Sequence, residues 1–312
     1  MSAPLHRIAL IGFGEAGRIL GAGWVATGRY AVAAWDVLLD APDRAAAMRE
    51  RIAAAGARAC GSFADAVADA ELVVCAVTAT SAESVARDGG ASMRAGQLFV
   101  DLNSVSPATK RRNAAHVERS GAAYVEGAVM APVPPSGLRV PIVLGGARAA
   151  DVRRLLEPAG MNLELGAPEI GRASATKMCR SILIKGLEAL VVECLQTARL
   201  YGVEREVLAS MKRTYPGVDW DAQAGYLLGR VLEHGRRRAA EMREVAETVH
   251  ETGLAPSMAS AIAERQQWVA DLVEAHPGLA SAKDADWPRT FDRMAASAGL
   301  RGLAGDDGAP RR

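Results

Sequence analysis

An apolar run at residues 8–11 leads directly into a glycine-rich turn and then a helical pattern, in the stretch IALIGFGEAGRIL (8–20). Gly12, Gly14 and Gly17 give the spacing G-x-G-x-x-G. Between a strand and a helix, this spacing predicts a loop for the pyrophosphate of a dinucleotide. The first glycine permits the tight turn, the second lets phosphates approach, and the third lets helix and strand pack closely. A glycine turn without a ligand is the alternative.

Asp36 ends the next predicted strand, AVAAWD (31–36). A carboxylate at this place accepts hydrogen bonds from the ribose hydroxyls of NAD and repels the 2′-phosphate of NADP. The nearest arginine after it is Arg44, so we predict NAD, with NADP as the alternative cofactor. A merely solvated Asp36 is the other interpretation. The predicted cofactor-binding residues are Gly12, Phe13, Gly14, Glu15, Ala16, Gly17, Asp36, Val77 and Thr78.

Apolar runs alternate with amphipathic ones through the first half of the chain. This pattern is typical of a parallel sheet covered by helices on both faces, the α/β Rossmann doubly wound class. Beyond about residue 168 only helical patterns follow, so we predict a dinucleotide-binding domain at 1–166. An all-helical substrate and dimerisation domain follows at 167–312, joined by a long helix. We predict strands at 7–13, 31–36, 71–77, 97–103 and 139–146, helices at 15–28, 42–55, 171–200, 222–250 and 256–274, and a frayed tail at 302–312.

Composition excludes several classes of protein. The net charge of +1 and the 4% of aromatic residues argue against nucleic-acid binding. No apolar stretch of about 18 residues lacks charges, which argues against a membrane span. The four cysteines show no CxxC spacing and no histidine cluster, so we predict no metal, buried thiols and a reducing, cytoplasmic setting. The amino-terminal residues lead directly into a strand pattern, which is not typical of a signal peptide.

Three segments together resemble the β-hydroxyacid dehydrogenase superfamily, which includes 6-phosphogluconate dehydrogenase. They are the glycine loop, DLNSVSPATKRR (101–112) and GRASATKMCRS (171–181). The resemblance covers most of the chain and implies a Rossmann domain followed by a helical domain. The part HGRRRAAEMREVAETVHETGLAP (234–256) resembles a branch defined by a phosphogluconate-dehydrogenase-like C-terminal domain, which implies little about the substrate.

By this resemblance Asn103 and Ser104 end a parallel strand, where open sheets bind their ligands. Asn and Ser offer a donor and acceptors for a substrate carboxylate, a hydroxyl or the nicotinamide amide. The alternative is a helix cap. That alternative explains Ser106 well, because it precedes Pro107 as N-cap and first helical residue.

Lys177 is the catalytic lysine that the resemblance implies. The family pattern G-x-G-x-x-x-K matches Gly171, Ala173 and Lys177 with one substitution, and the family asparagine one turn later is Ser181 here. At 100° per residue, Lys177, Ser181 and Lys185 lie within about 80° of arc on one helix face. Desolvation and Lys185 would favour the uncharged amine, which can move the proton of a hydroxyl while hydride leaves carbon. Ser181 and Lys185 are predicted to bind substrate; the alternative for Lys185 is an intrahelical pair with Glu188.

The family also has a Ser-Gly-Gly loop that holds the substrate carboxylate, and this chain departs from it. One alignment of GAVMAPVPPSGLRVPIVLGG (127–146) places Met130, Ala131 and Pro132 at the loop, and another places Pro134 or Ser136–Gly137 there. Prolines have no N–H to donate, so how the carboxylate is held stays open.

Arg237 stands in the arginine run 236–238 of a predicted helix. It either pairs with Glu241 on a solvated face or binds a substrate carboxylate or phosphate with its forked donors. We include it among the candidate substrate ligands, whereas His234 is expected to be a surface or packing histidine.

The sequence therefore predicts an NAD(P)-dependent oxidoreductase of a secondary alcohol, such as a 3-hydroxyacid or related acid, with Lys177 as general acid/base. An imine reductase of the same fold is one alternative, although such enzymes generally have a different residue at the position of Lys177. A non-catalytic NAD-binding sensor or scaffold is the other, favoured by the proline loop. Apolar residues spread around the helix 171–200, from Met178 to Leu195, predict a homodimer. Substrate identity and reaction direction are not determined.

Overall fold

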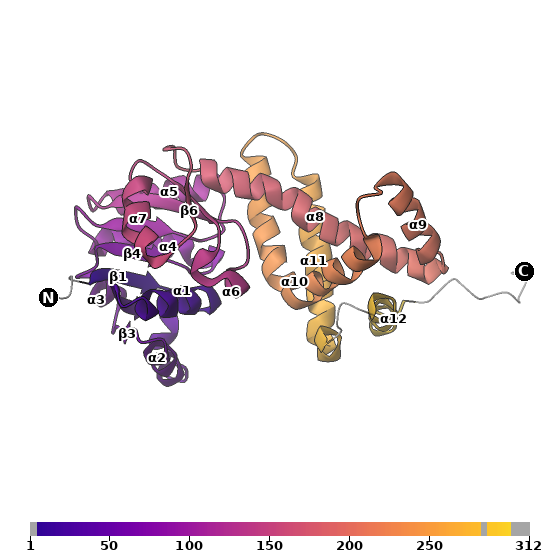
Figure 1. The fold of residues 1–312 in the computed structure, drawn as a ribbon, viewed down its shortest axis with the longest axis horizontal. Helices are drawn as coiled ribbons and strands as arrows, with labels where there is room; N and C mark the ends of the chain where they lie inside the picture. Colours follow the sequence, from indigo (N-terminus) through magenta and orange to yellow (C-terminus); the bar gives the residue numbers. More distant parts are fainter. Residues whose placement is uncertain (1–4, 282–285, 301–312) are drawn as a thin grey trace, which may run out of the picture. The chain divides into compact units, whose positions relative to one another are not determined.

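The computed structural model describes residues 5–281 and 286–300 and divides the chain into two compact units, Met1–Met178 and Cys179–Arg312 (Figure 1). The division falls within the long helix α8 (Arg172–Tyr201), and the predicted boundary at 166 lies in the loop before that helix. The tail predicted to be frayed, 302–312, lies outside the described residues.

One eight-stranded sheet forms the centre of the first unit. All neighbouring strands are parallel except β6 and β7, which pair antiparallel. The predicted Rossmann class is confirmed, and the sheet departs from the predicted parallel arrangement at β7, which runs antiparallel to β6. In spatial order the strands are β3 (Arg58–Ala59), β2 (Tyr30–Trp35), β1 (His6–Ile11), β4 (Leu72–Cys75), β5 (Leu98–Asp101), β6 (Ala123–Val129), β7 (Ile142–Gly145) and β8 (Leu163–Leu165).

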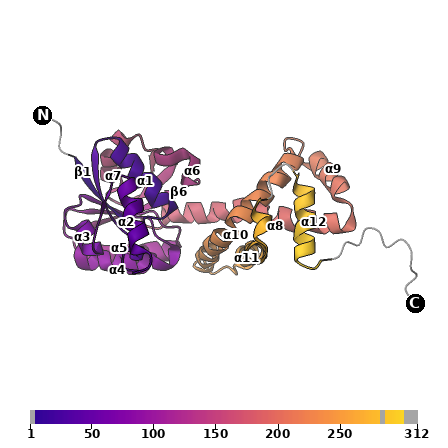
Figure 2. The same ribbon diagram turned by 90° about the horizontal axis from the view of Figure 1, so that it is seen from below.

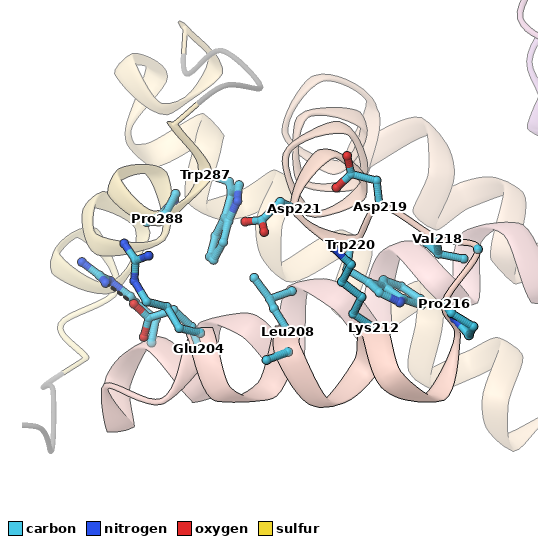
Figure 3. A pocket seen from close by; sticks show the side chains of 14 residues that line it. Glu204, Leu208, Lys212, Pro216, Val218, Asp219, Trp220, Asp221, Trp287 and Pro288 are labelled. Atoms are coloured by element: carbon cyan, nitrogen blue, oxygen red, sulfur yellow. Dashed lines mark hydrogen bonds and ion pairs between the residues drawn. The ribbon is translucent and has the colours of Figure 1, made fainter.

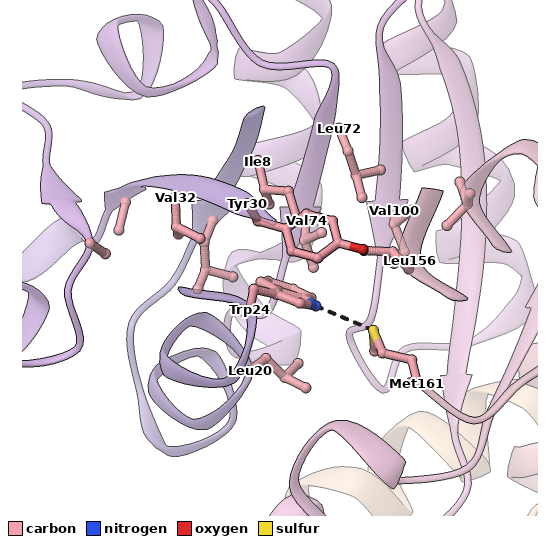
Figure 4. Close-up of a cluster of buried hydrophobic side chains, with 14 of the residues drawn as sticks. Ile8, Leu20, Trp24, Tyr30, Val32, Leu72, Val74, Val100, Leu156 and Met161 are labelled. Carbon is pink, nitrogen blue, oxygen red and sulfur yellow. Dashed lines mark hydrogen bonds between the residues drawn. The ribbon is translucent and has the colours of Figure 1, made fainter. Parts of the chain in front are cut away.

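Alternate residues of the strands enter two separate cores. Leu10 packs on one face with α1 (Glu15–Ala26), α2 (Ala45–Ala54) and α7 (Ala149–Leu156). In this core Trp24 Nε1 donates to Met161 Sδ at 3.3 Å (Figure 4). Ile11, the next residue of β1, packs on the opposite face, which is covered by α3 (Phe63–Val67), α4 (Ala82–Ser92) and α5 (Pro107–Glu118). Burial of both faces explains the continuous apolar strands.

The predicted strands and helices of the first half are all present, with ends shifted by a few residues. Three strands were not predicted. β3 and β8 are two and three residues long, and β6 carries Glu126 and Gly127 within its apolar run, which weakened the strand signal.

The second unit is helical, as predicted. α10 (Trp220–His250) and α11 (Ser257–Ala275) lie side by side (Figures 1 and 2). α9 (Glu204–Thr214) and α12 (Trp287–Ser297) complete the core with α8, around Val192, Val231 and Phe291. Within the described ranges, no helix is both long and apolar enough to span a bilayer.

Candidate active site

The glycine loop lies at the carboxyl end of β1. Gly12 has φ of 91°, and a Cβ there would lie 2.5 Å from the Ala76 carbonyl oxygen. A Cβ on Gly17 would lie 2.1 Å from the Gly12 carbonyl oxygen, so the chain's own packing requires glycine at both positions. A Cβ on Gly14 would meet no atom within 4 Å, and Gly14 gives α1 no side-chain cap. Open space beside a bare helix amino end fits the pyrophosphate of a dinucleotide.

Asp36 follows β2 and is held by two main-chain donors. Phe13 N–H donates to Oδ2 at 2.7 Å, and Leu38 N–H donates to Oδ1 at 3.0 Å. The residue is 9% exposed, so Asp36 is a buried part of the loop rather than a solvated side chain. Each carboxylate oxygen has a second lone-pair site that a ribose hydroxyl could use.

Asn103 joins the carboxyl ends of two adjacent strands, β4 and β5. Its Oδ1 accepts a hydrogen bond from Val77 N–H at 2.7 Å, and its Nδ2 donates to Cys75 Sγ at 3.2 Å. Because the residue is 4% exposed, both the oxygen and the nitrogen of its side-chain amide form their hydrogen bonds inside the protein. Asn103 thus sets the position of Val77 and of the next residue, Ser104, while Thr78 is exposed at the surface.

Lys177 reaches the same edge of the sheet from the second turn of α8. Its Nζ donates a hydrogen bond to Ser104 Oγ, and both residues are half-buried. A series of contacts leads from the glycine loop to this amine. Gly12 lies against Val77, since a Cβ on Gly12 would lie 2.8 Å from Val77 Cγ1. Val77 N–H donates a hydrogen bond to Asn103, and Asn103 directly precedes Ser104 in the chain. The predicted cofactor loop and Lys177 therefore belong to one connected edge within the first unit.

A buried network supports the end of β5 that leads to Ser104. Asp101 accepts hydrogen bonds from Lys110 Nζ at 2.9 Å, Tyr124 Oη at 2.7 Å and Asn113 Nδ2 at 3.0 Å. Burial alone would raise the pKa of Asp101, but the Lys110 ammonium and the hydrogen bonds outweigh burial and lower it. The carboxylate therefore stays ionised and keeps the strand end rigid.

The other predicted substrate residues lie in the second unit, where they meet at Glu241. Lys185 Nζ lies 2.8 Å from Glu241 Oε2 and donates to Ser181 Oγ at 3.4 Å. Arg237 donates to Glu241 Oε1 at 2.7 Å, so the predicted pair on a solvated face is present. Burial lowers the pKa of Lys185, against the opposing effect of Glu241.

Glu188, the alternative partner for Lys185, is occupied elsewhere. Its Oε2 accepts hydrogen bonds from Arg238 Nη1 at 2.9 Å and from Gln266 Nε2 at 3.1 Å. Burial raises the pKa of Glu188 despite the Arg238 guanidinium. The alternative of a Lys185–Glu188 pair is therefore wrong, because α10 and α11 supply partners that a single helix does not have. The arginine that enters the interior is Arg238, one residue after Arg237.

The loop after β6 carries the residues that the sequence could not align with the family's Ser-Gly-Gly loop. It includes the short helix α6 (Val133–Ser136). Met130 N–H donates to the Pro141 carbonyl at 2.9 Å. This N–H therefore already has a hydrogen-bond partner at the other end of the same loop.

The four cysteines are free thiols. Cys60 and Cys75 are buried, and burial raises the pKa of Cys75 to about 12. Cys179 and Cys194 are exposed on α8, so the expectation of buried thiols is wrong for these two. Within residues 5–281 and 286–300, no group of three or more His, Cys, Asp and Glu side chains is arranged to hold a metal ion.

A pocket with a cavity volume of about 620 Å³ opens in the second unit between α9, the loop before α10 and the start of α12. Figure 3 shows Leu208 and Trp287 projecting into it from opposite sides. Its lining contains none of the predicted cofactor or substrate residues. Glu204 Oε2 and Trp220 Nε1 are buried and have no hydrogen-bond partner among the described residues.

Two family profiles match parts of the chain. Residues 7–104 match the family described as NADP oxidoreductase coenzyme F420-dependent, a range that contains the glycine loop and ends at Ser104. Residues 198–269 match the family described as Domain of unknown function (DUF1932), which lies in the second unit.

Two solved structures resemble nearly the whole chain. A conserved hypothetical protein from Sinorhizobium meliloti is 36% identical, with 94% of this chain and 97% of that chain covered and a TM-score of 0.76. A conserved protein described as structurally similar to 3-hydroxyacid dehydrogenases is 31% identical, with 85% and 97% covered and a TM-score of 0.68. This chain belongs to the β-hydroxyacid dehydrogenase superfamily. An NAD-dependent L-serine dehydrogenase from Pseudomonas aeruginosa is 26% identical to this chain over 223 residues, 69% of this chain and 72% of that protein.

For this member of the β-hydroxyacid dehydrogenase superfamily, sequence reasoning missed three residues that support the site: Asp101, Lys110 and Glu126. All three are almost completely buried. A carboxylate inside an apolar strand was the available signal, in FVDLN (99–103) and YVEGAV (124–129). Such a carboxylate must have partners in the interior, but the sequence does not say which.

Proposed function

We propose that this protein is an NAD(P)-dependent dehydrogenase that oxidises the hydroxyl-bearing carbon of a 3-hydroxyacid or related acid. The observation that carries the proposal is the hydrogen bond from Lys177 to Ser104, on the sheet edge that also carries the glycine loop. The similarity to an NAD-dependent L-serine dehydrogenase supports both the cofactor class and the substrate class.

A nicotinamide cofactor, when bound, supplies the acceptor for the hydride. Gly14 and the amino end of α1 would hold its pyrophosphate, and Asp36 would accept its ribose hydroxyls. The Asp36 carboxylate would repel a 2′-phosphate, which supports a preference for NAD over NADP.

Lys177 would handle the proton of the substrate hydroxyl. A hydroxyl placed beside the Lys177 amine and the Ser104 hydroxyl would meet groups that can both donate and accept hydrogen bonds. During oxidation the uncharged amine takes the proton, and during reduction the ammonium returns it. Asn103 would act by keeping Ser104 in place, through its bonds to the end of β4.

The test compares turnover of the wild type with that of Lys177→Ala. Thermal shift with NADH and NADPH identifies the cofactor, and absorbance of the nicotinamide then reports oxidation of L-serine, a primary alcohol, and 3-hydroxybutyrate, a secondary one. We expect Lys177→Ala to lower kcat/KM by about 10²–10⁴-fold, the usual cost of losing a general acid/base. The thermal shift with NADH should stay unchanged.

Lys212→Ala is the matched control, because Lys212 is an exposed lysine of α9. Turnover by Lys177→Ala within a few-fold of wild type would exclude the proposed role. Cofactor binding with no turnover of any alcohol or imine would instead favour a non-catalytic NAD-binding protein.

We also propose a cytoplasmic homodimer. Met178, Val191 and Leu195, which the sequence suggested for an interface, are buried within the chain itself. The support comes from apolar residues of α8 that are exposed. Three of them, Ile184 (44%), Leu187 (40%) and Leu190 (58%), also belong to the set that the sequence suggested, and Leu183 (77%) lies beside them. A second copy would remove this apolar surface from water. Sedimentation of the wild type and of Leu183→Glu tests this, since a charge in the interface should favour the monomer.

A further inference from the structure

Glu126 binds the first turn of α8 through its carboxylate. The residue lies within β6 and is 0% exposed. Its Oε1 accepts hydrogen bonds from Gly171 N–H at 2.8 Å and Ala173 N–H at 3.0 Å, and its Oε2 accepts one from Ser174 N–H at 3.2 Å. The first N–H groups of a helix have no acceptor within it, and a negative charge there also interacts favourably with the helix dipole. The buried Glu126 side chain thus supplies both acceptors for the first N–H groups and a negative charge at the amino end of α8.

The surroundings of Glu126 leave room for this arrangement. Gly145 is its cross-strand partner in β7, and a Cβ on Gly145 would lie 2.8 Å from Glu126 Oε1. Gly171 has φ of 105°, a conformation that glycine adopts easily and that turns the chain into α8. Two glycines therefore permit the carboxylate to approach the main chain of the helix.

The same anchor determines where Lys177 points. Lys177 follows Ser174 by about one helical turn, so fixing the first turn also fixes the direction of its side chain. Asp101 of β5 pairs in register with Glu126, and Ser104 follows closely after Asp101. Both partners of the Lys177–Ser104 hydrogen bond are thereby tied to the same pair of strands.

We infer that Glu126 is a positioning residue, which holds α8 so that the Lys177 amine meets Ser104 at the sheet edge. Its consequence for turnover rests on the proposed function. The position of α8 and of the Lys177 amine does not rest on the proposed function, because the accessibility of an amine can be measured without substrate.

The experiment compares Glu126→Gln and Glu126→Ala with wild type by timed acetylation using acetic anhydride, followed by peptide mass spectrometry. We expect Lys177 to be acetylated about 10-fold faster in Glu126→Gln, and faster still in Glu126→Ala. Losing a charge-assisted hydrogen bond increases local opening by about that factor. Lys110, which is 1% exposed, should remain protected and serves as the internal control.

Glu164→Gln makes the same chemical change on the exposed strand β8 and should behave as wild type. With a turned-over substrate, Glu126→Gln should lower kcat by about 10²-fold, as expected for a misplacement of about 1 Å. The KM for NAD should not change. If Glu126 were merely structural, Glu126→Gln would lower the free energy of unfolding but would not lower kcat selectively while leaving the KM for NAD unchanged.

Unchanged acetylation of Lys177 in both Glu126 variants would overturn the inference. An equal increase at Lys110 would do the same, because it would mean general loosening of the unit. If no variant, wild type included, shows turnover, the proposed dehydrogenase fails while the acetylation series still decides the position of Lys177.

Discussion

Each unit contains a buried carboxylate beside a cation, and the pKa values of the two carboxylates shift in opposite directions. In the first unit the pKa of Asp101 is lowered, and in the second the pKa of Glu188 is raised. Burial opposes ionisation at both residues. Asp101 overcomes it with the ammonium of Lys110 and three neutral donors: the Tyr124 hydroxyl, the Asn113 amide and the Asn103 N–H.

Glu188 receives hydrogen bonds from the Arg238 guanidinium and the Gln266 amide, and Arg230 Nε lies 4.0 Å from its Oε1. Burial also lowers the pKa of Arg238, whose Nε has no hydrogen-bond partner in the described parts of the chain. The comparison shows that the number of donors around a carboxylate, rather than burial alone, decides whether its charge is stabilised. The first unit thereby gains a rigid base for its site, whereas the charges of the second unit are only partly compensated.

The largest expected effect comes from removing the charge of Asp101. Asp101→Asn leaves the Lys110 ammonium buried without a counter-charge and should lower the free energy of unfolding by about 3–5 kcal/mol. Glu188→Gln should cost less, because burial raises the pKa of Glu188 and so offsets part of the stabilisation that its charge gives. Urea unfolding of both variants measures the difference. A greater loss for Glu188→Gln would reverse the comparison.

The pH dependence of stability should differ in sign between the two carboxylates. The pKa of Asp101 is lowered in the fold, so its stabilisation is present above its unfolded pKa of about 3.9 and is lost as pH falls through the folded pKa. The pKa of Glu188 is raised, so its favourable contribution is present below its unfolded pKa of about 4.3 and is lost as pH rises through the folded pKa.

Urea midpoints between about pH 3 and 7 test this, with each variant compared to wild type. The advantage of wild type over Asp101→Asn should grow as pH rises through the lower part of this range. The advantage of wild type over Glu188→Gln should shrink as pH rises. The same sign in both series would mean that Glu188 is as well compensated as Asp101.

The smallest effect is expected from Arg237, next to the buried Arg238. The Arg237 side chain is 54% exposed, whereas its partner Glu241 is 19% exposed. Arg237→Ala should change the free energy of unfolding by less than about 0.5 kcal/mol, as is usual for exposed pairs. A loss above about 2 kcal/mol in the same urea experiment would show that Arg237 belongs to the buried group.

The sequence indicated those parts of the molecule that depend on neighbours along the chain. Gly12, Gly14 and Gly17 follow a strand and open a helix, and that order alone identifies the loop. Asp36 follows from its place after the next strand. Lys177 was predicted through the resemblance of a short motif, on a helix whose length is visible in the apolar pattern. Each of these signals lies within a single strand–turn–helix segment.

Only the tertiary structure decided which distant groups meet. Glu126 reaches the amino end of α8 from β6, and Lys185 pairs with Glu241 of α10 rather than with Glu188 of its own helix. β7 runs antiparallel although its sequence resembles that of the other strands. The physical reason is that a buried charge accepts any donor that packing brings within hydrogen-bond distance, and a one-dimensional pattern contains no information about which donor that is.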